Sequence, residues 1–440
     1  MSDEQKNAKE KNFDDSKYSN ATHLIYGKHV SDKWDYSHHV TAPISSSTTF
    51  RLDSVERGAL GFVNWAESSK HEGEPPIFIY DRLGEPNKDM LEENLAMIEK
   101  AEMGVAFASG MGAISGVLGV LTKTGDEIIA HTTLYGCTIS LFLNWYPRYN
   151  IKVNQVDLTD INSINNAVNE NTKVIYFETP ANPNLDIIDI SNIRKTIDEI
   201  NKERKDGDKI QIVVDNTFST PYCQRPLEHG ADFVVHSLTK GIGGYGTDIG
   251  GMVVGRKEYR DRLLLYRKDF GGVLSPRNAW SILTYGLPSL AIRQRQQIAS
   301  AQILAEKLEK HPKVKFVNYP GLESFKYYEL AKKQMIDFDG KFAPGHLIYF
   351  GLVGENEEES KELGKKMMNY VAENAYTMTL AVSLGHTRTL IEHPASMTHS
   401  VVPTDELSKY GLHPGGVRIA VGLENAEDIW TDLEDALNIL

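Results

Sequence analysis

A strand, a lysine and a glycine-rich loop follow one another in the segment Ala231-Asp-Phe-Val-Val-His-Ser-Leu-Thr-Lys-Gly-Ile-Gly-Gly-Tyr-Gly246. The apolar, β-branched run at 233–235 is typical of a buried strand. Ser237, Thr239 and Lys240 come just past the expected end of that strand. The glycines after the lysine allow a tight loop and leave room for a ligand. The segment therefore predicts a binding site at the carboxyl end of a strand.

The lysine in this segment suggests a particular chemistry. An amine beside a buried strand end is poorly hydrated, which lowers its pKa and makes it a nucleophile toward a carbonyl group. Hydroxyl groups on both sides of Lys240 favour a nearby anion such as phosphate. A lysine imine together with a phosphate indicates pyridoxal 5'-phosphate (PLP). This segment alone leaves open the alternative of an exposed lysine in a flexible glycine-rich loop.

Length and charge limit the class of protein. The chain has 440 residues and a formal net charge of −13. The length predicts more than one domain, and the negative charge argues against a nucleic-acid partner. No apolar run could span a bilayer, and the first twenty residues lack the apolar core of a signal peptide, so we expect no membrane partner. We expect about the first fifteen residues to be a disordered tail.

Two cysteines, Cys137 and Cys223, are too few for a disulfide framework. This fits a reducing compartment, and we expect a cytoplasmic protein. No Cys/His cluster has the spacing of a metal site, so no metal is expected.

Strands and helices alternate from about residue 87 onward, which predicts a large, mostly parallel, seven-stranded sheet covered on both faces. Asn87 is expected to cap the first helix, and Pro288 to kink or divide a long helical run. The strands are expected at 105–108, 127–130, 152–156, 174–177, 210–214, 233–235 and 252–254, with helices around 112–122, 138–146, 160–169 and 191–204. After Pro312, strands at 347–352 and 417–421 and helices at 357–374 and 427–440 predict a smaller α+β layer.

We therefore expect three parts in the chain. Residues 1–84 would form an extended N-terminal segment that contacts a neighbouring subunit, because residues 16–80 show little periodicity. Residues 85–290 would form the large cofactor-binding domain, and residues 291–440 the small C-terminal domain.

Polar residues follow the predicted strands at the edge where an open parallel sheet binds its ligand. Asp215 ends a buried strand, where a carboxylate could keep the ring nitrogen of PLP protonated; the alternative is an aspartate that caps the next turn. Ser109-Gly-Met-Gly112 at a helix start could hold a phosphate, with Ser237 and Thr239 completing the cup.

Two further side chains have candidate roles. Tyr135 follows a strand and could stack on the cofactor ring, although a lone tyrosine also packs in cores. Arg418 lies on an apolar strand and could bind a substrate carboxylate through its guanidinium fork. The alternative for Arg418 is an internal salt bridge.

Together these segments resemble the Cys/Met-metabolism family of PLP-dependent enzymes, which have fold type I, the aspartate-aminotransferase-like fold. The resemblance covers nearly everything from Thr22 to the C-terminus. It rests on Ala42-Pro43, Thr48-Thr-Phe50, Tyr80-Asp-Arg82, Ser109-Gly-Met-Gly112, Leu134-Tyr-Gly136, Glu178-Thr-Pro-Ala-Asn-Pro-Asn184, Val214-Asp-Asn-Thr217, His236-Ser-Leu-Thr-Lys240, Ser383-Leu-Gly385, His393-Pro-Ala-Ser-Met-Thr-His399 and Val417-Arg418.

The resemblance implies a role for each matched residue. Lys240 would bind the cofactor aldehyde, Asp215 would pair with the pyridinium, and Tyr135 would stack on the ring and assist proton transfer at the leaving group. Tyr80 and Arg82 would reach the phosphate of the neighbouring subunit, which implies a homodimer, usually paired into a tetramer. Of the remaining residues, Gly110, Met111, Ser237 and Thr239 would hold the phosphate, Asn182 would contact the ring hydroxyl, and Ser383 and Arg418 would take the substrate carboxylate.

Within the family the chain most resembles the methionine γ-lyase branch. Cys137 follows the glycine after Tyr135, and Lys268 and Asp269 precede a Gly-Val-Leu-Ser-Pro segment. The resemblance implies γ-elimination of L-methionine or a related sulfur amino acid to 2-oxobutanoate, ammonia and methanethiol, with a carbon–sulfur lyase as the enzyme class. The tyrosine would protonate the leaving thiolate, with a pKa depressed by nearby cations. Cys137 would help to recognise the substrate, although it could instead be a small buried residue, and Cys223 would be structural.

Other activities of the family stay open at this point. O-acetylhomoserine sulfhydrylase and cystathionine γ-synthase chemistry, which replaces the γ substituent, would use the same residues, as would cystathionine γ-lyase chemistry. A regulatory protein on a borrowed fold would be expected to lack Lys240 or Asp215, and both are present.

Three departures from the family pattern bear on these expectations. Glu85 and Asn87 stand where the family has asparagine and a hydroxyl residue, which affects contacts across the subunit interface. Residues 64–79 form a longer segment than is usual. Arg388 places a charge near the expected substrate entrance.

Overall fold

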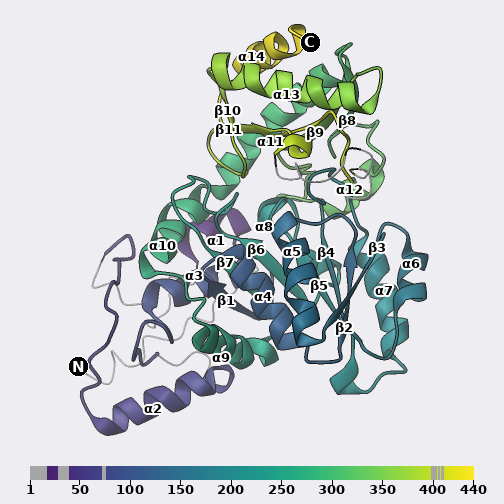
Figure 1. Cartoon of the computed structure of the whole chain (residues 1–440). Helices are drawn as coiled ribbons and strands as arrows, with labels where there is room; N and C mark the ends of the chain where they lie inside the picture. The colour runs from purple at the N-terminus through teal and green to yellow at the C-terminus, as the bar shows by residue number, and fades with distance from the viewer. Residues whose placement is uncertain (1–16, 28–38, 72–75, 398–403, 405–406, 408–410) are drawn as a thin grey trace.

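The computed structural model describes residues 17–27, 39–71, 76–397, 404, 407 and 411–440. The chain forms two sheets with their covering helices, and the smaller sheet lies above the larger one in Figure 1. The tail expected over the first fifteen residues, and the last two residues of the motif that ends at His399, lie outside the described residues.

The large sheet contains all seven strands predicted for it, in the order β1-β7-β6-β5-β4-β2-β3. Strand β7 runs antiparallel to both of its neighbours, and the other strand pairs are parallel. The predicted fold class is therefore confirmed, and each strand lies within two residues of its predicted bounds. The strands are β1 (Met103–Phe107), β2 (Glu127–His131), β3 (Lys152–Val156), β4 (Thr172–Glu178), β5 (Gln211–Asp215), β6 (Phe233–Ser237) and β7 (Gly251–Gly255).

Except at the edge strand β3, both faces of the large sheet are buried, which explains why these strands are mainly apolar runs. Alternate residues of one strand enter different cores: Val213 and Val235 pack on one face, and Val214 and Val234 on the other. The first face is covered by α4 (Gly110–Leu121), α5 (Gly136–Asn144) and α9 (Arg260–Phe270). The opposite face is covered by α3 (Pro86–Ile98), α6 (Ile161–Ala167) and α7 (Ile190–Asn201).

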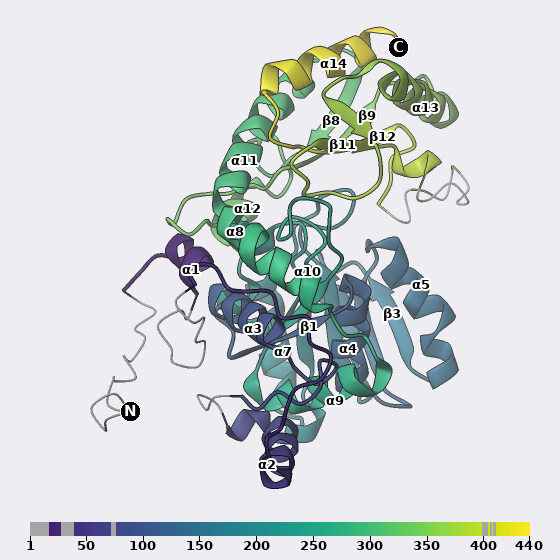
Figure 2. The same ribbon diagram turned by 90° about the vertical axis from the view of Figure 1, so that its left-hand side faces the viewer.

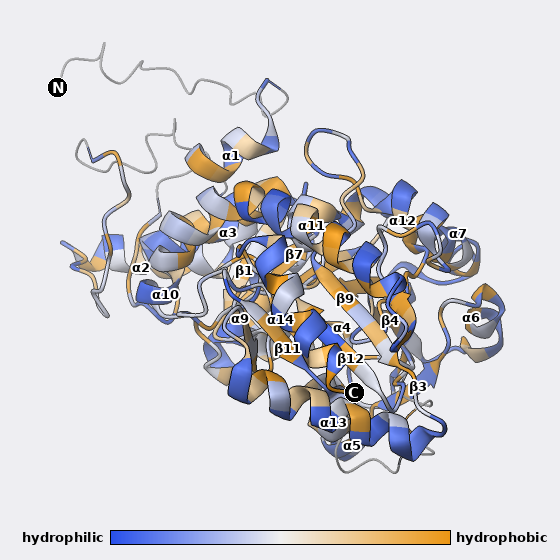
Figure 3. Cartoon of the chain, turned by 90° about the horizontal axis from the view of Figure 1, so that it is seen from above, coloured by the Kyte–Doolittle hydropathy of each residue, from blue (hydrophilic) through white to orange (hydrophobic). Residues whose placement is uncertain are grey.

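The smaller sheet has five strands in the order β10-β11-β12-β9-β8. Its central strands β9 and β12 match the prediction, whereas the short or partly exposed strands β8, β10 and β11 gave no clear pattern. In Figure 3, β9 has the hydrophobic colour between helices that carry both colours. The elements are β8 (Val314–Asn318), β9 (Leu347–Leu352), α13 (Glu357–Asn374), β10 (Met378–Leu380), β11 (Thr389–Glu392), β12 (Gly416–Ala420) and α14 (Ala426–Asn438).

A long helix, α11 (Leu287–Glu309), runs from the large sheet toward the small one (Figure 2). It follows α10 (Pro276–Ser281) and a π-helical turn at Ile282–Gly286. Pro288 lies directly after this π-helical turn, which divides the helical run where the proline was predicted to interrupt it. The division of the chain at residue 290 falls within α11 and stays a prediction.

The N-terminal part contains more helix than expected. In addition to α1 (Asn20–Tyr26), residues Val55–Ala66 form α2, which Ser54 caps by accepting a hydrogen bond from the Arg57 backbone N–H. The expectation of an irregular segment over 16–80 is wrong here. Apolar side chains of α2 such as Phe62 are exposed rather than buried in a core.

The cap of α3 also differs from the prediction. The Glu85 carboxyl group caps the helix by accepting hydrogen bonds from Asn87 N at 2.9 Å and Lys88 N at 2.6 Å. Pro86 occupies the first turn, so the helix begins before Asn87. The Asn87 side chain instead binds the N-terminal segment. It accepts a hydrogen bond from Ser45 N at 2.7 Å and donates one to Pro43 O at 3.0 Å. In the described part of the chain, no helix is both long and apolar enough to cross a membrane.

Candidate active site

Lys240 lies in the turn after β6 and faces the small sheet. Its Nζ donates a hydrogen bond to Ser383 Oγ at 2.7 Å. Burial and the positive charge of Arg418 lower the pKa of the lysine, against the opposing effects of Glu392 and Cys137. A lysine held in this way has a larger neutral fraction, and the neutral amine is the nucleophile that a carbonyl group requires.

The loop that carries Lys240 is held by contacts from Arg293 and Gly385, which lie far from it in the sequence. The buried Arg293 donates to Gly241 O at 2.7 Å and to Ile242 O at 3.0 Å. From the small sheet, Gly385 adopts a φ of 76° against the same turn, and a Cβ there would overlap Gly241 N. The glycine that follows Ser383-Leu is therefore required by a close backbone approach.

Asp215 is the last residue of β5, at the same edge of the sheet. Its Oδ1 accepts a hydrogen bond from Thr217 N at 3.0 Å. Desolvation raises the pKa of this carboxyl group, although the hydrogen bonds from Thr217 and the charge of His236 oppose the rise. A carboxylate in such a place gains from a cation beside it, as a protonated pyridine ring would be.

The N-terminus of α4 faces β6 and offers a place for an anion. Ser109 Oγ accepts from Gly112 N at 3.1 Å, whereas the N–H groups of Gly110 and Met111 precede the first intrahelical bond. A Cβ on Gly110 would lie 2.9 Å from Ser237 Cβ, so only glycine leaves this space open.

The other hydroxyl predicted for the phosphate cup, that of Thr239, has backbone partners. It donates to Gly250 O at 3.3 Å and accepts from Gly250 N at 3.1 Å. It can donate to a phosphate only by giving up its bond to Gly250 O.

Tyr135 flanks the N-terminus of α5, and its backbone N–H donates to Glu178 Oε1 at 2.7 Å. Burial first, and then the neighbouring Cys137, raise the pKa of the phenol to about 12, which outweighs the opposite effect of Arg418. The prediction of a depressed tyrosine pKa is therefore wrong for this chain, because desolvation and a thiol outweigh the cation. Cys137 is exposed, so it is not a small buried residue, whereas Cys223 is buried, as expected for a structural residue.

Arg418 is buried on β12 and has three polar partners. It donates to Asn182 Oδ1 at 2.8 Å and to Ser383 O at 3.0 Å, and it forms an ion pair with Glu392 Oε1 at 2.9 Å. Burial lowers the pKa of the guanidinium, and Glu392 and Tyr135 oppose this effect. The internal salt bridge considered as the alternative is present, and Arg418 lies within the group of site residues.

Four predicted site residues lie apart from this group. Arg82 donates to Lys268 O at 2.8 Å and lies over the Tyr80 ring at 5.5 Å, while Lys268 forms an ion pair with Asp269 at 3.0 Å. No contact among the described residues joins them to Lys240. Residues that serve the active site of a neighbouring subunit are expected to lie away from the site of their own chain, as these four do. Their roles stay predictions.

Sequence reasoning left four residues of the site unassigned: Glu178, Thr217, Arg293 and Glu392. Glu178 and Thr217 lie within motifs at strand ends, so the rule that ligands bind at this edge could have included them. Arg293 and Glu392 come from distant segments, and no local pattern marks them.

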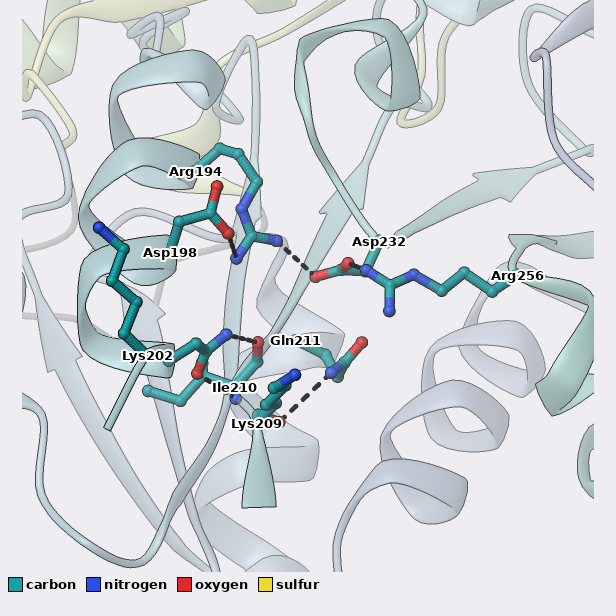
Figure 4. A pocket seen from close by; sticks show the side chains of 9 residues that line it. Arg194, Asp198, Lys202, Lys209, Ile210, Gln211, Asp232 and Arg256 are labelled. Atoms are coloured by element: carbon teal, nitrogen blue, oxygen red, sulfur yellow. Dashed lines mark hydrogen bonds and ion pairs between the residues drawn. The ribbon is translucent and has the colours of Figure 1, made fainter. Parts of the chain in front are cut away.

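A polar cavity of about 310 Å³ lies at the other end of the large sheet, where β5 and β6 begin (Figure 4). Its arginines are neutralised locally: Arg194 pairs with Asp198 at 2.7 Å and with Asp232 at 3.1 Å, and Arg256 also pairs with Asp232. Lys240 and Asp215 lie at the carboxyl ends of the strands, so this cavity is not part of the active site. In the described ranges, no group of three or more His, Cys, Asp or Glu side chains is arranged to hold a metal ion.

The residues at the carboxyl edge fit PLP by their chemistry. They provide an amine of lowered pKa at Lys240 and a partly buried carboxyl group at Asp215. The turn at Gly110 has room that a side chain would fill. These features correspond to the aldehyde, the ring nitrogen and the phosphate of the cofactor.

Comparison with known proteins agrees with this fit. A family model described as "Cys/Met metabolism PLP-dependent enzyme" matches residues 21–438. An L-methionine gamma-lyase of Fusobacterium nucleatum subsp. nucleatum is 43% identical over 397 residues, 90% of this chain and 92% of that protein. A cystathionine beta-lyase of Lactococcus lactis subsp. cremoris is 36% identical over 417 residues, 94% of this chain and 98% of that protein.

The fold agrees as well. The crystal structure of metB from Corynebacterium glutamicum superposes with a TM-score of 0.82 at 33% identity, covering 97% of this chain and all of that one. The predicted cofactor is thus confirmed together with the fold. The chain belongs to the Cys/Met-metabolism family of PLP-dependent enzymes.

Proposed function

We propose that the protein is a carbon–sulfur lyase that converts L-methionine to methanethiol, 2-oxobutanoate and ammonia by γ-elimination. The observation that carries the proposal is that Cys137 lies close enough to Tyr135 and Lys240 to contribute to the pKa of both: it helps to raise the pKa of the phenol and opposes the lowering of the pKa of the lysine. A protonated phenol and a soft, polarisable thiol at the substrate side of the lysine suit a thioether substrate. The 43% identity to an L-methionine gamma-lyase supports the same choice.

Lys240 is the base in this proposal. PLP, when bound, supplies an electron sink for the negative charge that develops at the substrate α carbon. The lowered pKa of Lys240 increases its neutral fraction, whose Nζ can take the α proton, and the hydrogen bond to Ser383 Oγ orients that nitrogen. Asp215 keeps the ring nitrogen of the cofactor protonated.

Tyr135 is the acid that serves the leaving group. Once Lys240 has passed on the α proton, its Nζ takes the second proton from the β carbon; the γ carbon–sulfur bond then breaks, and the sulfur leaves with the bonding electrons and takes a proton from the phenol. With a pKa near 12, Tyr135 carries that proton throughout the neutral range.

The remaining residues orient the substrate and the cofactor. Arg418 and Ser383 bind the substrate carboxylate, and Asn182, already bonded to Arg418, contacts the ring hydroxyl of the cofactor. Gly110 and Met111 offer backbone N–H groups to the phosphate, together with the hydroxyls of Ser237 and Thr239. Cys137, with Lys268 and Asp269 from a neighbouring subunit, borders the substrate side chain.

Cleavage of cystathionine is the second candidate. Arg388 is exposed. After desolvation, the positive charges of Lys240 and Arg388 are the causes that lower the pKa of His386. Cystathionine carries a second amino-acid head group, whose carboxylate could bind a cation at that position. The 36% identity to a cystathionine beta-lyase points the same way.

Product analysis separates these reactions. The holoenzyme is incubated with L-methionine, with L-cystathionine, or with O-acetyl-L-homoserine plus sulfide, and 2-oxobutanoate, pyruvate, homocysteine and volatile thiol are measured. We expect 2-oxobutanoate and methanethiol from methionine, with the highest kcat/KM of the three. Turnover of cystathionine, or formation of homocysteine from O-acetylhomoserine, without turnover of methionine would contradict the proposal.

We also propose that the active unit is a homodimer in which Tyr80 and Arg82 of one subunit complete the phosphate site of the other, with two dimers forming a tetramer. Co-expression of Lys240→Ala chains with Arg82→Ala chains tests the shared site. Mixed dimers carry one site with both native residues, so activity should reappear when neither variant alone is active. Mixed dimers without activity would exclude sharing, and native mass spectrometry gives the number of subunits.

A further inference from the structure

Glu178 and Asp215 form a pair of carboxyl groups at the active-site edge. They are the last residues of neighbouring parallel strands, β4 and β5, and lie opposite each other in the register. Neighbouring strands are about 4.8 Å apart, and opposed residues project to the same face of the sheet. Glu178 is only 6% exposed. Two negative charges at this distance in a buried place would repel each other strongly.

The surroundings favour the charge on Asp215. The Asp215 carboxyl group accepts hydrogen bonds from Thr217, which stabilise its anion, and the charge of the buried His236 on β6 lowers its pKa as well. Among the described residues, none of the ion pairs involves Glu178, and its partners are backbone N–H groups of Tyr135 and Asn182. Desolvation and the charge of Asp215 raise the pKa of Glu178 well above its ordinary value, and they outweigh the opposite effect of these two N–H groups.

Glu178 also holds the helix that carries Tyr135. The side chain of Tyr135 does not cap α5, and the N–H of Tyr135 donates to Glu178 Oε1 at 2.7 Å instead. A single buried carboxyl group therefore touches the proposed acid and lies beside the proposed partner of the ring nitrogen. The pKa of Asp215 or of Tyr135 is also affected by three other titratable or charged groups: Tyr176 on β4, Cys137 on α5 and Arg418 on β12.

We propose that Glu178 is a positioning residue: it stays protonated so that the one negative charge of the pair remains on Asp215, and its Oε1 fixes Tyr135 through the backbone. This inference rests on the roles proposed for Asp215 and Tyr135. A second anion at Glu178 would oppose the departure of a thiolate close to Tyr135. A neutral acid can hold the backbone without that cost.

Two substitutions separate positioning from simple structural support. Glu178→Gln keeps the shape and the neutral state, whereas Glu178→Ala removes the contact to Tyr135. Glu127→Gln is the matched control, because Glu127 is also buried on a strand of the large sheet but lies at the far end of β2. All are compared as holoenzymes by visible circular dichroism of bound PLP, by pH titration of its absorbance, and by kcat and KM.

We expect Glu178→Gln to keep the dichroism, the titration midpoint and kcat within about threefold, as the control does. Glu178→Ala should lose part of the dichroism and lower kcat by ~10–100-fold, as expected when a reacting group is displaced by about 1 Å. The dichroism and the titration require no turnover, so they test the inference even if methionine is not the substrate.

The inference is overturned by any of three results. The first is that Glu178→Gln is as impaired as Glu178→Ala, or that the midpoint of its absorbance titration is shifted. The native residue would then be charged. Another is an alanine variant with native dichroism and kcat. The third needs no folded Glu178→Ala protein: the infrared spectrum of the wild type should contain a protonated carboxylic acid band that Glu178→Gln lacks, and identical spectra would exclude the proposed proton.

Discussion

The Lys240 amine and the Ser383 hydroxyl form a hydrogen bond of 2.7 Å that joins the two sheets at the active site. Lys240 follows β6 of the large sheet, and Ser383 lies between β10 and β11 of the small one. Ser383 adopts a φ of 94°, a conformation that costs a residue with a side chain about 1–3 kcal/mol. Its hydroxyl accepts the hydrogen bond from Lys240, and its carbonyl oxygen accepts one from Arg418. This strained residue therefore links the proposed base to the proposed carboxylate site.

Replacement of Lys240 by alanine tests the base. We expect borohydride reduction to fix PLP covalently to the wild type but not to Lys240→Ala, and turnover to fall by at least ~10³-fold because both the attachment point and the base are lost. Lys152→Ala, which removes an exposed lysine at the far end of the sheet, is the control. Full turnover by Lys240→Ala would exclude the assignment.

Replacement of Tyr135 by phenylalanine tests the acid. The ring can still stack, so we expect cofactor binding to persist while kcat falls ~10²–10⁴-fold. Since the phenol pKa is raised to about 12, the wild type should show no loss of kcat from Tyr135 ionisation below roughly pH 10. A falling limb near pH 8 in the wild type that disappears in Tyr135→Phe would show a depressed pKa and contradict this prediction.

The sequence predicted the part of the site that follows from strand ends. Asp215, Ser237 and Lys240 could be placed because the ligand of an open parallel sheet binds at the carboxyl edge of its strands. The bond from Lys240 to Ser383 spans 143 residues, and only tertiary packing determines it. The pKa of Tyr135 was misjudged because a nearby cation could be expected from the sequence, whereas burial and the contact with Cys137 could not.

Helix caps also could not be predicted from the sequence alone. The sequence offered Asn87 as a cap, since asparagine is a common capping residue, but Glu85 takes that place. The choice depends on Pro86, which starts the helix one residue after Glu85, and on Pro43 and Ser45, which hold the Asn87 side chain elsewhere. Long, apolar, buried elements were predictable, whereas exposed helices and capping contacts depend on distant partners.

The buried ion pair of Glu392 and Arg418 gives a prediction on stability. Glu392→Gln would leave the guanidinium without its counter-charge, and we expect the free energy of unfolding to fall by about 3 kcal/mol. Denaturant titration of the apoprotein measures this without a contribution from the cofactor. The double variant Glu392→Gln/Arg418→Gln should recover part of the loss, because no unpaired charge remains. Fully additive losses would contradict a direct interaction.

Glu85 gives a prediction on pH. The side chain is fully buried, and desolvation raises its pKa to about 7 in the folded protein, from 4.5 for an unperturbed glutamate. Between these values the unfolded chain releases the proton that the folded chain keeps, so this group makes stability fall as pH rises from about 4.5 to about 7. The rise of the pKa from 4.5 to about 7 corresponds to about 3 kcal/mol.

Glu85→Gln should therefore remove this pH dependence, because glutamine does not titrate. The measurement is the free energy of unfolding of wild type and variant at pH 5 and at pH 7.5, with the exposed Glu170→Gln as control. The wild type should lose more stability than Glu85→Gln between the two pH values, and the control should follow the wild type. If the wild type and Glu85→Gln change in parallel, Glu85 releases its proton equally in the folded and unfolded states, and the helix cap is a charged carboxylate.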